Sequence, residues 1–468
     1  MKRQTKIVCT LGPATSTQPQ IEALIRAGMN VARLNCSHGD WDAKNQWIHW
    51  IRGCRQAETP VAILADLQGP KFRIGEIPNG GILTVKTGQV VTLSQHGATD
   101  LTVPSDVMFE KMDVGDNLLL GDGNVELRLI HEEAGVFRSE ALCSGEVKSR
   151  QGMTLRGKSF SVPALTDKDR GDAIAAARAG VDFIALSYVR CADDLKELRS
   201  LIDSVDRSIR ICAKIETRDA LDNLDEILLV SDVIMVARGD LGLQMHIEEV
   251  PLAQKKIIRA CMASGTPVIT ATQMLESMIG SPRPTRAEAS DVANAILDGT
   301  DAVMLSGETA AGSYPVEAVS TMARIAEVTE ASFDHRAHFK MLADREGIKS
   351  TESFAQATVQ MAMHLDVKAI VCTSTSGSTP QLISKYRPDC QILCATWSDR
   401  TMEQLAVTWG VEAAHIDLGE NTDETIANAL TAFLREGRIS RGDDVLITAG
   451  VPTGVPGNTN LILHQKVK

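Results

Sequence analysis

The stretch "IRICAKIETRDALDNLDEILLVSDVIMVARGD", residues 209–240, decides the fold because it contains the same pattern twice. The apolar run 209–216 ends in polar residues, and after an intervening segment the run 233–240 ends in the same way. Runs rich in Val, Ile, Leu and Ala are typical of strands buried on both faces of a parallel sheet. The stretch therefore predicts two successive parallel strands.

Similar runs recur on both sides of this stretch, at 6–12, 30–39, 61–69, 183–190, 267–274 and 302–309. Most are spaced by 22 to 35 residues, which is enough for a strand and a covering helix. Intervening segments such as 18–28 and 169–180 have helical periodicity and end in Gly, a common helix C-terminus. Eight strand–helix units predict a (β/α)₈ barrel.

The regular spacing is interrupted once, since about 113 residues separate the runs 61–69 and 183–190. This insertion alternates apolar and polar residues, as in "ILTVKTGQVVTLS" (82–94), which predicts a small all-β domain at the barrel mouth. After residue 345 strand-like and helical segments alternate again. We therefore expect an α/β fold: a TIM barrel (1–70 and 161–344), an inserted small β-barrel lid domain (71–160) and a C-terminal open α/β regulatory domain (345–468).

Composition excludes several classes of protein. The chain has 468 residues, 44% hydrophobic and 23% charged, and its net charge of −12 argues against nucleic-acid binding through a general basic surface. The ten cysteines include no Cys-x-x-Cys pair, as expected for reduced thiols. The apolar core of "MKRQTKIVCTLGPA" is too short for a signal peptide, and no apolar run approaches the length of a membrane span. These features predict a soluble, cytoplasmic protein without nucleic-acid or membrane partners.

Polar and charged residues gather where the predicted strands end, and active sites of such barrels lie at that end. The set is Arg33, Asn35, Ser37, His38, Asp66, Lys71, Arg73, Lys214, Glu216, Arg238, Asp240, Thr272, Gln273, Ser306 and Glu308. Each has an ordinary alternative, since a Lys-x-Glu pair is usually a salt bridge and a Thr-Gln a turn hydrogen bond. Their shared position at one end of eight strands favours a site.

The chemistry of this set indicates phosphoryl transfer. Glu216 and Asp240 end consecutive strands, which lie about 5 Å apart in a sheet, and such carboxylates suit Mg²⁺ or Mn²⁺. Arg33, Arg73 and Lys214 are suited to neutralising phosphate oxygens. The residues alone therefore predict a metal-dependent enzyme that acts on a phosphorylated carboxylic acid.

Several motifs resemble the pyruvate kinase family from about residue 5 to the end of the chain. They are "TKIVCTLGPAT", "AGMNVARLNCSHG", "KIE", "MVARGDLG", the 50-residue stretch from Thr270 to Val319, and "SKYRPDCQIL". The resemblance implies Mg²⁺-dependent transfer of phosphate from phosphoenolpyruvate to ADP, giving pyruvate and ATP in the last step of glycolysis. The alternatives are another barrel enzyme acting on phosphoenolpyruvate or enolates, which would not depend on ADP, and an inactive metabolite sensor.

The resemblance also implies roles for single residues. Glu216 and Asp240 would bind the divalent metal, Arg33 the phosphate, and Lys214 the transferring phosphoryl group and the enolate oxygen. Thr272 would lie where the enolate is protonated, and Ser306 and Glu308 on the path that delivers the proton. The substrate carboxylate would meet the backbone amides of Arg238, Gly239 and Asp240. Asn35, His38 and Arg73 would contact the nucleotide, and Asp122 of the lid would close over the site.

The chain departs from the family's commonest pattern at Leu67 and Lys71, where many members have Thr and Glu. Those members require K⁺ beside residues equivalent to Asn35, Ser37 and Asp66. A lysine ammonium is a compact charge comparable to K⁺, and a bound K⁺ 4 Å from Lys71 would add repulsion of about 1–4 kcal/mol. We therefore expect Lys71 to replace K⁺. The alternative is that Lys71 points to solvent and K⁺ still binds.

The segment "CTSTSGST" (372–379) joins a predicted strand to a helix N-terminus in the C-terminal domain. Its hydroxyls and free amides could accept a phosphate, and the family often binds a sugar phosphate in this loop. We therefore expect an effector site at Thr373, Ser374, Thr375, Ser376, Gly377, Ser378 and Thr379. The alternatives are a plain N-cap turn and an unregulated enzyme, because the facing segment "AGVPTGVPGNTN" has no basic residue. The resemblance further implies a homotetramer.

Overall fold

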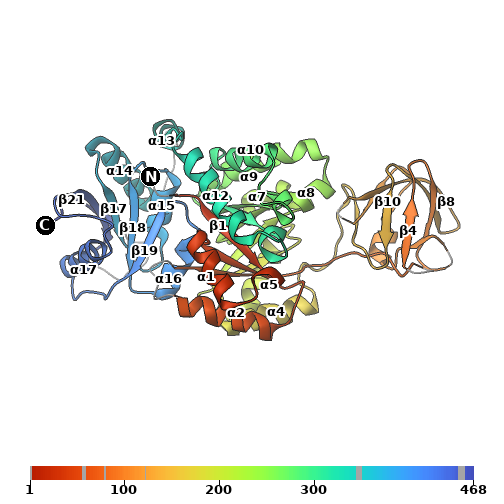
Figure 1. The fold of residues 1–468 in the computed structure, drawn as a ribbon, viewed down its shortest axis with the longest axis horizontal. Helices are drawn as coiled ribbons and strands as arrows, with labels where there is room; N and C mark the ends of the chain where they lie inside the picture. The colour runs from red at the N-terminus through yellow and green to blue at the C-terminus, as the bar shows by residue number, and fades with distance from the viewer. Residues whose placement is uncertain are drawn as a thin grey trace.

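The computed structural model describes residues 3–54, 60–77, 81–97, 99–121, 123–343, 350–451 and 459–468. Its centre is a closed barrel of eight parallel strands in the order β1-β16-β15-β14-β13-β12-β3-β2 (Figure 1). The strands are β1 (Lys6–Leu11), β2 (Val31–Asn35), β3 (Ala62–Asp66), β12 (Phe183–Leu186), β13 (Arg210–Ile215), β14 (Val233–Ala237), β15 (Val268–Ala271) and β16 (Ala302–Leu305). The predicted (β/α)₈ barrel is confirmed.

The continuous apolar runs are explained by burial on both faces of the barrel wall. In β14, Val233 and Met235 belong to the core inside the barrel, whereas Ile234 and Val236 belong to the core between strands and helices. Successive strand residues point to opposite faces, so a strand between two cores is apolar at every position.

The helices of the barrel cover its outer face. They are α1 (Gln18–Ala27), α2 (Trp41–Gly53), α4 (Asp167–Ala179), α5 (Ala192–Asp203), α6 (Arg218–Asp222), α7 (Leu224–Val230), α8 (Arg238–Gln244), α9 (Val250–Ser264), α10 (Arg286–Leu297), α11 (Gly307–Ala310) and α12 (Pro315–Glu330). Gly28 and Gly180 end α1 and α4 with φ of 123° and 75°, the left-handed region that glycine enters most easily. The glycine stops predicted from the sequence are therefore confirmed.

The insertion forms a β domain at the end of the molecule opposite the C-terminal domain (Figure 1). A six-stranded and a two-stranded sheet, ordered β11-β7-β8-β9-β5-β6 and β10-β4, enclose one apolar core. The elements are β4 (Ile82–Val85), β5 (Val90–Ser94), β6 (Leu101–Thr102), α3 (Asp106–Phe109), β7 (Asn117–Leu120), β8 (Val125–Glu133), β9 (Val136–Ala141), β10 (Gly145–Lys148) and β11 (Met153–Leu155). We call this domain the lid.

The C-terminal domain is the open α/β sheet expected from the sequence. Its strands are β17 (Ala369–Thr373), β18 (Gln391–Thr396), β19 (Val411–His415), β20 (Asp444–Gly450) and β21 (Thr459–Lys466), in the order β19-β18-β17-β20-β21. The helices are α13 (His335–Ala343), α14 (Ser350–Leu365), α15 (Ser378–Lys385), α16 (Asp399–Gln404) and α17 (Thr422–Arg435). The antiparallel edge strand β21 was not predicted.

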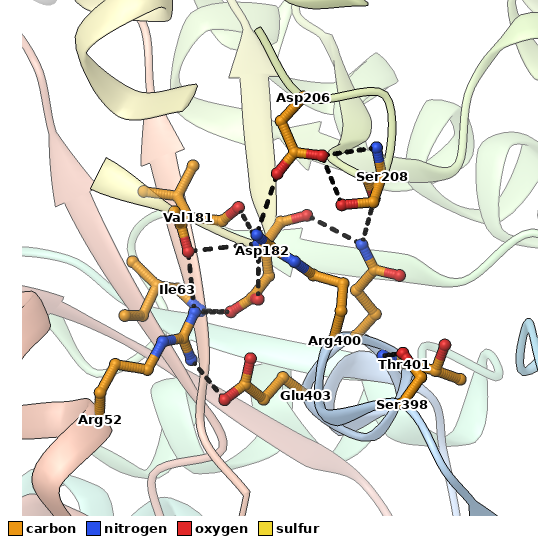
Figure 2. A network of polar contacts seen from close by, with 12 residues as sticks. Arg52, Ile63, Val181, Asp182, Asp206, Ser208, Ser398, Arg400, Thr401 and Glu403 are labelled. Atoms are coloured by element: carbon orange, nitrogen blue, oxygen red, sulfur yellow. Dashed lines mark hydrogen bonds and ion pairs between the residues drawn. The ribbon is translucent and has the colours of Figure 1, made fainter. Parts of the chain in front are cut away.

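A polar network joins the amino-terminal end of the barrel to the C-terminal domain (Figure 2). Asp182, just before β12, is fully buried and forms ion pairs with Arg52 of α2 at 2.8 Å and Arg400 of α16 at 3.2 Å. Its carboxylate also accepts a hydrogen bond from the Ile63 amide at 2.7 Å. The C-terminal domain is thus attached at the end of the barrel opposite the lid.

The described residues contain no helix that is both long and apolar enough to cross a membrane. All ten cysteines are free thiols.

Candidate active site

A cavity of about 440 Å³ lies between the carboxyl ends of the barrel strands and the lid. The lid side includes Met108, Leu119, Gln151 and Thr154. The barrel side and the nearby connections bring together many of the residues singled out in the sequence. These are Arg33, Asn35, Ser37, Asp66, Lys71, Arg73, Lys214, Glu216 and Asp240.

Asp66, at the end of β3, is the hub of the charged groups in this cavity. Its side chain is paired with Arg33 through Oδ2, at 2.7 Å from Nε and 2.6 Å from Nη2. Its Oδ1 lies 3.3 Å from Lys214 Nζ. Burial alone would raise the pKa of Asp66, but the charges of Lys214 and Arg33 outweigh burial and lower it. The hub is therefore ionised and holds both cations in place.

Lys214, on β13, is the most enclosed cation of the site. Burial disfavours its charged form, but the carboxylates of Asp66, Glu216 and Asp240 outweigh burial and raise its pKa above the usual value. Ser187 accepts a hydrogen bond from Lys214 Nζ at 2.6 Å and donates one to the Leu67 carbonyl at 2.7 Å. The ammonium is therefore charged and fixed in direction.

Glu216 and Asp240 are the two carboxylates expected to hold a divalent cation. Glu216 is buried, its pKa is raised by that burial, and Asp240 adds to the rise although Lys214 opposes it. The Tyr188 amide donates to one Glu216 oxygen, and the other lies 3.5 Å from Lys214 Nζ. Within the described part of the chain no cluster of three or more potential metal-binding side chains occurs. A hard cation with few protein ligands, such as Mg²⁺, fits this pair.

Asp66 is also one of the residues predicted to lie beside a monovalent cation or beside the lysine that replaces it. Its Oδ1 is buried and accepts no hydrogen bond in the described part of the chain, although Lys214 Nζ is nearby. Lys71 lines the same cavity, is exposed, and makes no hydrogen bond or ion pair with any described residue. Asn35 uses its side-chain oxygen to accept the Ser37 amide at 3.0 Å. The oxygen atoms near Asp66 could therefore hold a small cation. The replacement of K⁺ by Lys71 stays a prediction.

Thr272 and the segment Arg238–Asp240 form a second hydrogen-bonded group beside the carboxylates. Thr272 has a φ of 67°, unusual for a β-branched residue, and its hydroxyl accepts the Gly239 amide at 2.8 Å. The Arg238 guanidinium turns back to the Thr272 carbonyl at 2.6 Å and to Asp291 at 2.7 Å. A substrate carboxylate at the Gly239 amide would therefore have to replace the Thr272 hydroxyl.

Ser306 and Glu308 lie at the end of β16 and do not line the cavity described above. Glu308 is fully buried and accepts the amides of Ser306 at 2.7 Å and Leu275 at 3.0 Å. His38 is exposed and also lies outside the lining, and Asp122 falls outside the described residues. Arg238, Gly239, Thr272 and Gln273 also lie outside the lining, so the cavity brings together a part of the predicted site.

Sequence reasoning missed the residues that orient the charged groups. Ser187 and Tyr188 lie in the second half of the predicted run 183–190 and directly follow the observed strand β12, so their place near a strand end was visible in the sequence. Thr10 of β1 bonds Arg33 at 3.0 Å, but it lies inside a strand and has no sequence signal of its own.

The loop 373–379 lies against the amino-terminal end of the barrel. Arg210 of β13 donates to the Ser376 carbonyl at 2.7 Å, and Thr401 of α16 donates to the Thr375 carbonyl at 2.8 Å. Ser374 accepts the Gly377 amide at 3.0 Å, and the Thr379 and Thr459 hydroxyls lie 2.6 Å apart. Several loop hydroxyls therefore have protein partners, and the effector site remains a prediction.

Comparison with known proteins gives a consistent result along the chain. Family models described as pyruvate kinase, barrel domain, and pyruvate kinase, alpha/beta domain, match residues 2–319 and 352–463. A pyruvate kinase of Geobacillus stearothermophilus is 46% identical over 99% of this chain and 80% of its own, and one of Sporosarcina psychrophila is 44% identical over 98% and 80%. The crystal structure of a pyruvate kinase from Cryptosporidium parvum superposes with a TM-score of 0.93 at 34% identity, covering 100% of this chain and 96% of that one. The chain therefore belongs to the pyruvate kinase family of phosphotransferases.

Proposed function

We propose that this chain transfers a phosphoryl group from phosphoenolpyruvate to ADP and so forms pyruvate and ATP, the last step of glycolysis. The observation that carries the proposal is the arrangement of Arg33 and Lys214 around the ionised Asp66, beside Glu216, in one cavity. Two fixed cations next to a pair of carboxylates suit a phosphorylated carboxylic acid and a divalent metal.

In this reaction, different residues of the chain bind the phosphate, the enolate, the substrate carboxylate and the nucleotide. Arg33 and Lys214 hold phosphate oxygens, and Lys214 also stabilises the negative oxygen of the enolate that forms when the phosphoryl group leaves. The enolate carbon then takes up a proton near Thr272, which Ser306 and Glu308 supply through hydrogen bonds. The main-chain amides at Arg238–Asp240 orient the substrate carboxylate, while Asn35, His38 and Arg73 contact the nucleotide.

Glu216 and Asp240 would hold Mg²⁺, or Mn²⁺ in its place. When bound, the metal neutralises charge on the phosphoryl oxygens and on the substrate. Glu216 is suited to this role because its burial raises its pKa, so it gains more from a nearby cation than an exposed carboxylate would.

We further propose that K⁺ is not required, because Lys71 can bring its ammonium to Asp66 Oδ1, which is paired with Lys214 at 3.3 Å but accepts no hydrogen bond from a described residue. Lys71 has no competing partner among the described residues, and its stem is flexible. The nearest alternative keeps Lys71 in solvent and K⁺ at Asn35, Ser37 and Asp66.

The remaining expectations concern the whole protein. Residues 1–70 and 161–344 would form the catalytic domain, 71–160 a lid that closes over the nucleotide, and 345–468 a regulatory domain with a sugar-phosphate effector at Thr373–Thr379. A homotetramer in the cytoplasm is what relatives of this family lead us to expect.

The direct test is pyruvate formation from phosphoenolpyruvate and ADP with Mg²⁺, in buffer free of K⁺ and NH₄⁺ and again with K⁺ added. Full activity without K⁺ would support both the reaction and Lys71 as its internal cation. Activity that requires K⁺ would keep the reaction and overturn the lysine proposal. Turnover of phosphoenolpyruvate without ADP would favour a mutase or lyase. Binding without turnover, even with sugar phosphates added, would favour a sensor.

A further inference from the structure

The second connection between lid and barrel is held at Phe160. The Phe160 side chain is 2% exposed and belongs to the apolar core of the lid. It also packs on Phe72 of the first connection, with ring centroids 4.8 Å apart. The main chain of Phe160, in contrast, is bound by the barrel, because Arg190 donates to its carbonyl at 2.8 Å. Phe160 is therefore a junction between the two domains.

Arg190 is itself held in a fixed direction. Its Nη2 forms an ion pair with Asp194 of α5 at 3.0 Å, and its amide donates to the same carboxylate at 2.9 Å. Its carbonyl accepts a hydrogen bond from Asn223 at 2.8 Å. A guanidinium fixed at both its side chain and its main chain can hold the Phe160 carbonyl in one place.

The same short segment reaches the charged groups of the cavity. Ser187 accepts from Lys214, and the Tyr188 amide donates to Glu216. Tyr188 has a φ of 58°, a left-handed conformation that is unusual for an aromatic residue and is often found at functional sites. Residues 187–190 therefore touch the lysine, the metal-binding carboxylate and the lid connection in succession.

The lid carries one wall of the nucleotide site. Arg73 forms a main-chain bridge with Gly152 and donates to the Arg150 carbonyl at 2.9 Å, so it moves with this part of the lid. Arg33 and Lys214 lie on barrel strands instead. A change in lid position would thus displace Arg73 from Glu216 and Asp240 without moving Arg33 or Lys214.

We propose that Arg190 is a positioning residue for nucleotide binding, which sets the lid against the barrel by holding the Phe160 carbonyl. The inference rests on the proposed function, because it takes ADP as the ligand between Arg73 and the carboxylates. Loss of the Arg190 bond allows the lid several positions, so nucleotide binding weakens while contacts with phosphoenolpyruvate on the barrel remain.

The test compares Arg190→Gln with Arg199→Gln in the full-length protein. Arg199 is a matched control on α5, the helix that follows Arg190. It also bonds a carbonyl (Ile209, 2.7 Å) and a carboxylate (Asp232, 2.9 Å), but both belong to the barrel. We expect Arg190→Gln to raise the KM for ADP about tenfold, with the KM for phosphoenolpyruvate within about twofold of wild type. Arg190→Lys keeps the charge but has one donor nitrogen in place of the two that Arg190 uses. Its KM for ADP should therefore lie between those of the wild type and Arg190→Gln. Arg199→Gln should leave both KM values unchanged.

Hydrogen exchange of the amides at 157–162 gives a second readout that does not depend on catalysis. These amides should exchange about tenfold faster in Arg190→Gln and at the wild-type rate in Arg199→Gln. Unchanged exchange and an unchanged KM for ADP in Arg190→Gln, or equal effects of the two substitutions, would overturn the proposal. If Arg190→Gln does not fold, Asp194→Asn removes the carboxylate charge that holds the Arg190 guanidinium, and unchanged exchange in that variant overturns the proposal. Wild-type protein that forms no pyruvate would refute the proposed function, whereas the exchange data would still decide whether Arg190 anchors the lid.

Discussion

Asp66 determines the charge balance of the cavity. It keeps Arg33 and Lys214 close together although both are cations, and its own pKa is lowered by them despite burial. A phosphorylated carboxylic acid would meet cations whose positions are already fixed, so little reorganisation is needed when it binds. A fixed cation accelerates a reaction only if it lies where negative charge develops in the transition state. In the proposed reaction that charge develops at the enolate oxygen near Lys214, so Lys214 is the residue to test.

Lys214→Met should reduce kcat by at least about 10²–10³-fold, since it removes the only buried ammonium that faces both Asp66 and Glu216 among the described residues. Methionine is also long and unbranched, and Arg33 still neutralises Asp66, so the fold should be kept. Pyruvate formation and a thermal melt measure the two effects. Lys255→Met is the control, because Lys255 pairs with Asp298 on the barrel surface. Unchanged turnover of Lys214→Met would remove the lysine from the mechanism.

Lys71→Glu should convert the chain into an enzyme that depends on K⁺. The substitution replaces a mobile ammonium with a carboxylate near Asp66, and an added K⁺ then relieves the repulsion between the carboxylates. We expect K⁺ to stimulate the variant about tenfold or more and to leave the wild type unchanged. Rates measured with a K⁺ series and with a matched series of tetramethylammonium separate cation binding from ionic strength. A wild type that responds to K⁺ as strongly as the variant would contradict the prediction.

The elements predicted best from the sequence are those whose burial is uniform. The runs 233–240 and 302–309 were found because β14 and β16 lie between two cores and are apolar at each position. The edge strand β21 was missed because its exposed and half-buried residues carry no such run. The ends of the strands could also be predicted from the sequence, and for this reason Arg33, Lys214 and Glu216 were identified together.

The missed contacts depend on geometry that no local pattern encodes. Tyr188 donates its amide to Glu216 across 28 positions in the chain, and Arg190 reaches the Phe160 carbonyl across 30 positions. Similarly, the residues preceding α2 turn His38 towards solvent, although it follows a strand end in the sequence. Sequence reasoning finds which residues gather at the barrel mouth, and the turns after each strand decide which of them face the cavity.

Helix α13 should make the stability of the protein sensitive to acid through His338. Its ring lies 3.0 Å from the Lys385 carbonyl, and burial, followed by the charges of Arg387 and His335, lowers its pKa to about 4. In the unfolded chain the pKa returns to about 6.5, so stability is complete above that pH and falls as the pH decreases towards 4. The loss should reach roughly 1–1.5 kcal/mol at pH 5.5 and about 3 kcal/mol near pH 4.

Urea denaturation midpoints at pH 7.5 and 5.5 measure this effect in the wild type and in His338→Gln. Glutamine can still donate to the Lys385 carbonyl, but it does not titrate. The variant should therefore lose less stability than the wild type between the two pH values. Equal losses would show that other groups cause the acid sensitivity.

At the scale of the whole molecule, the lid and the C-terminal domain lie at opposite ends of the barrel (Figure 1). The C-terminal domain is attached at the starts of strands, through Asp182 before β12 and Asp301 before β16, the latter paired with Arg387 at 3.1 Å. Arg210, at the start of β13, contacts the loop 373–379, and Lys214 lies near the end of the same strand. Any effect of a ligand at that loop on the cavity must therefore pass along the barrel strands, which are rigid elements, or through movement of the whole domain.

Asp182 is a fully buried carboxylate that joins the barrel to the C-terminal domain through Arg400 (Figure 2). Asp182→Asn keeps the shape of the side chain but leaves Arg52 and Arg400 short of a buried charge, and breaking such a pair typically costs about 3–5 kcal/mol. We expect the melting temperature to fall by about 6–20 °C. Asp206→Asn is the control, since Asp206 pairs with the same Arg400 at 3.1 Å from a more exposed position and should cost less than about 1 kcal/mol. If the two variants melt within about 2 °C of each other, the buried carboxylate adds no more than the exposed one, and the attachment must depend on the apolar and main-chain contacts between the domains.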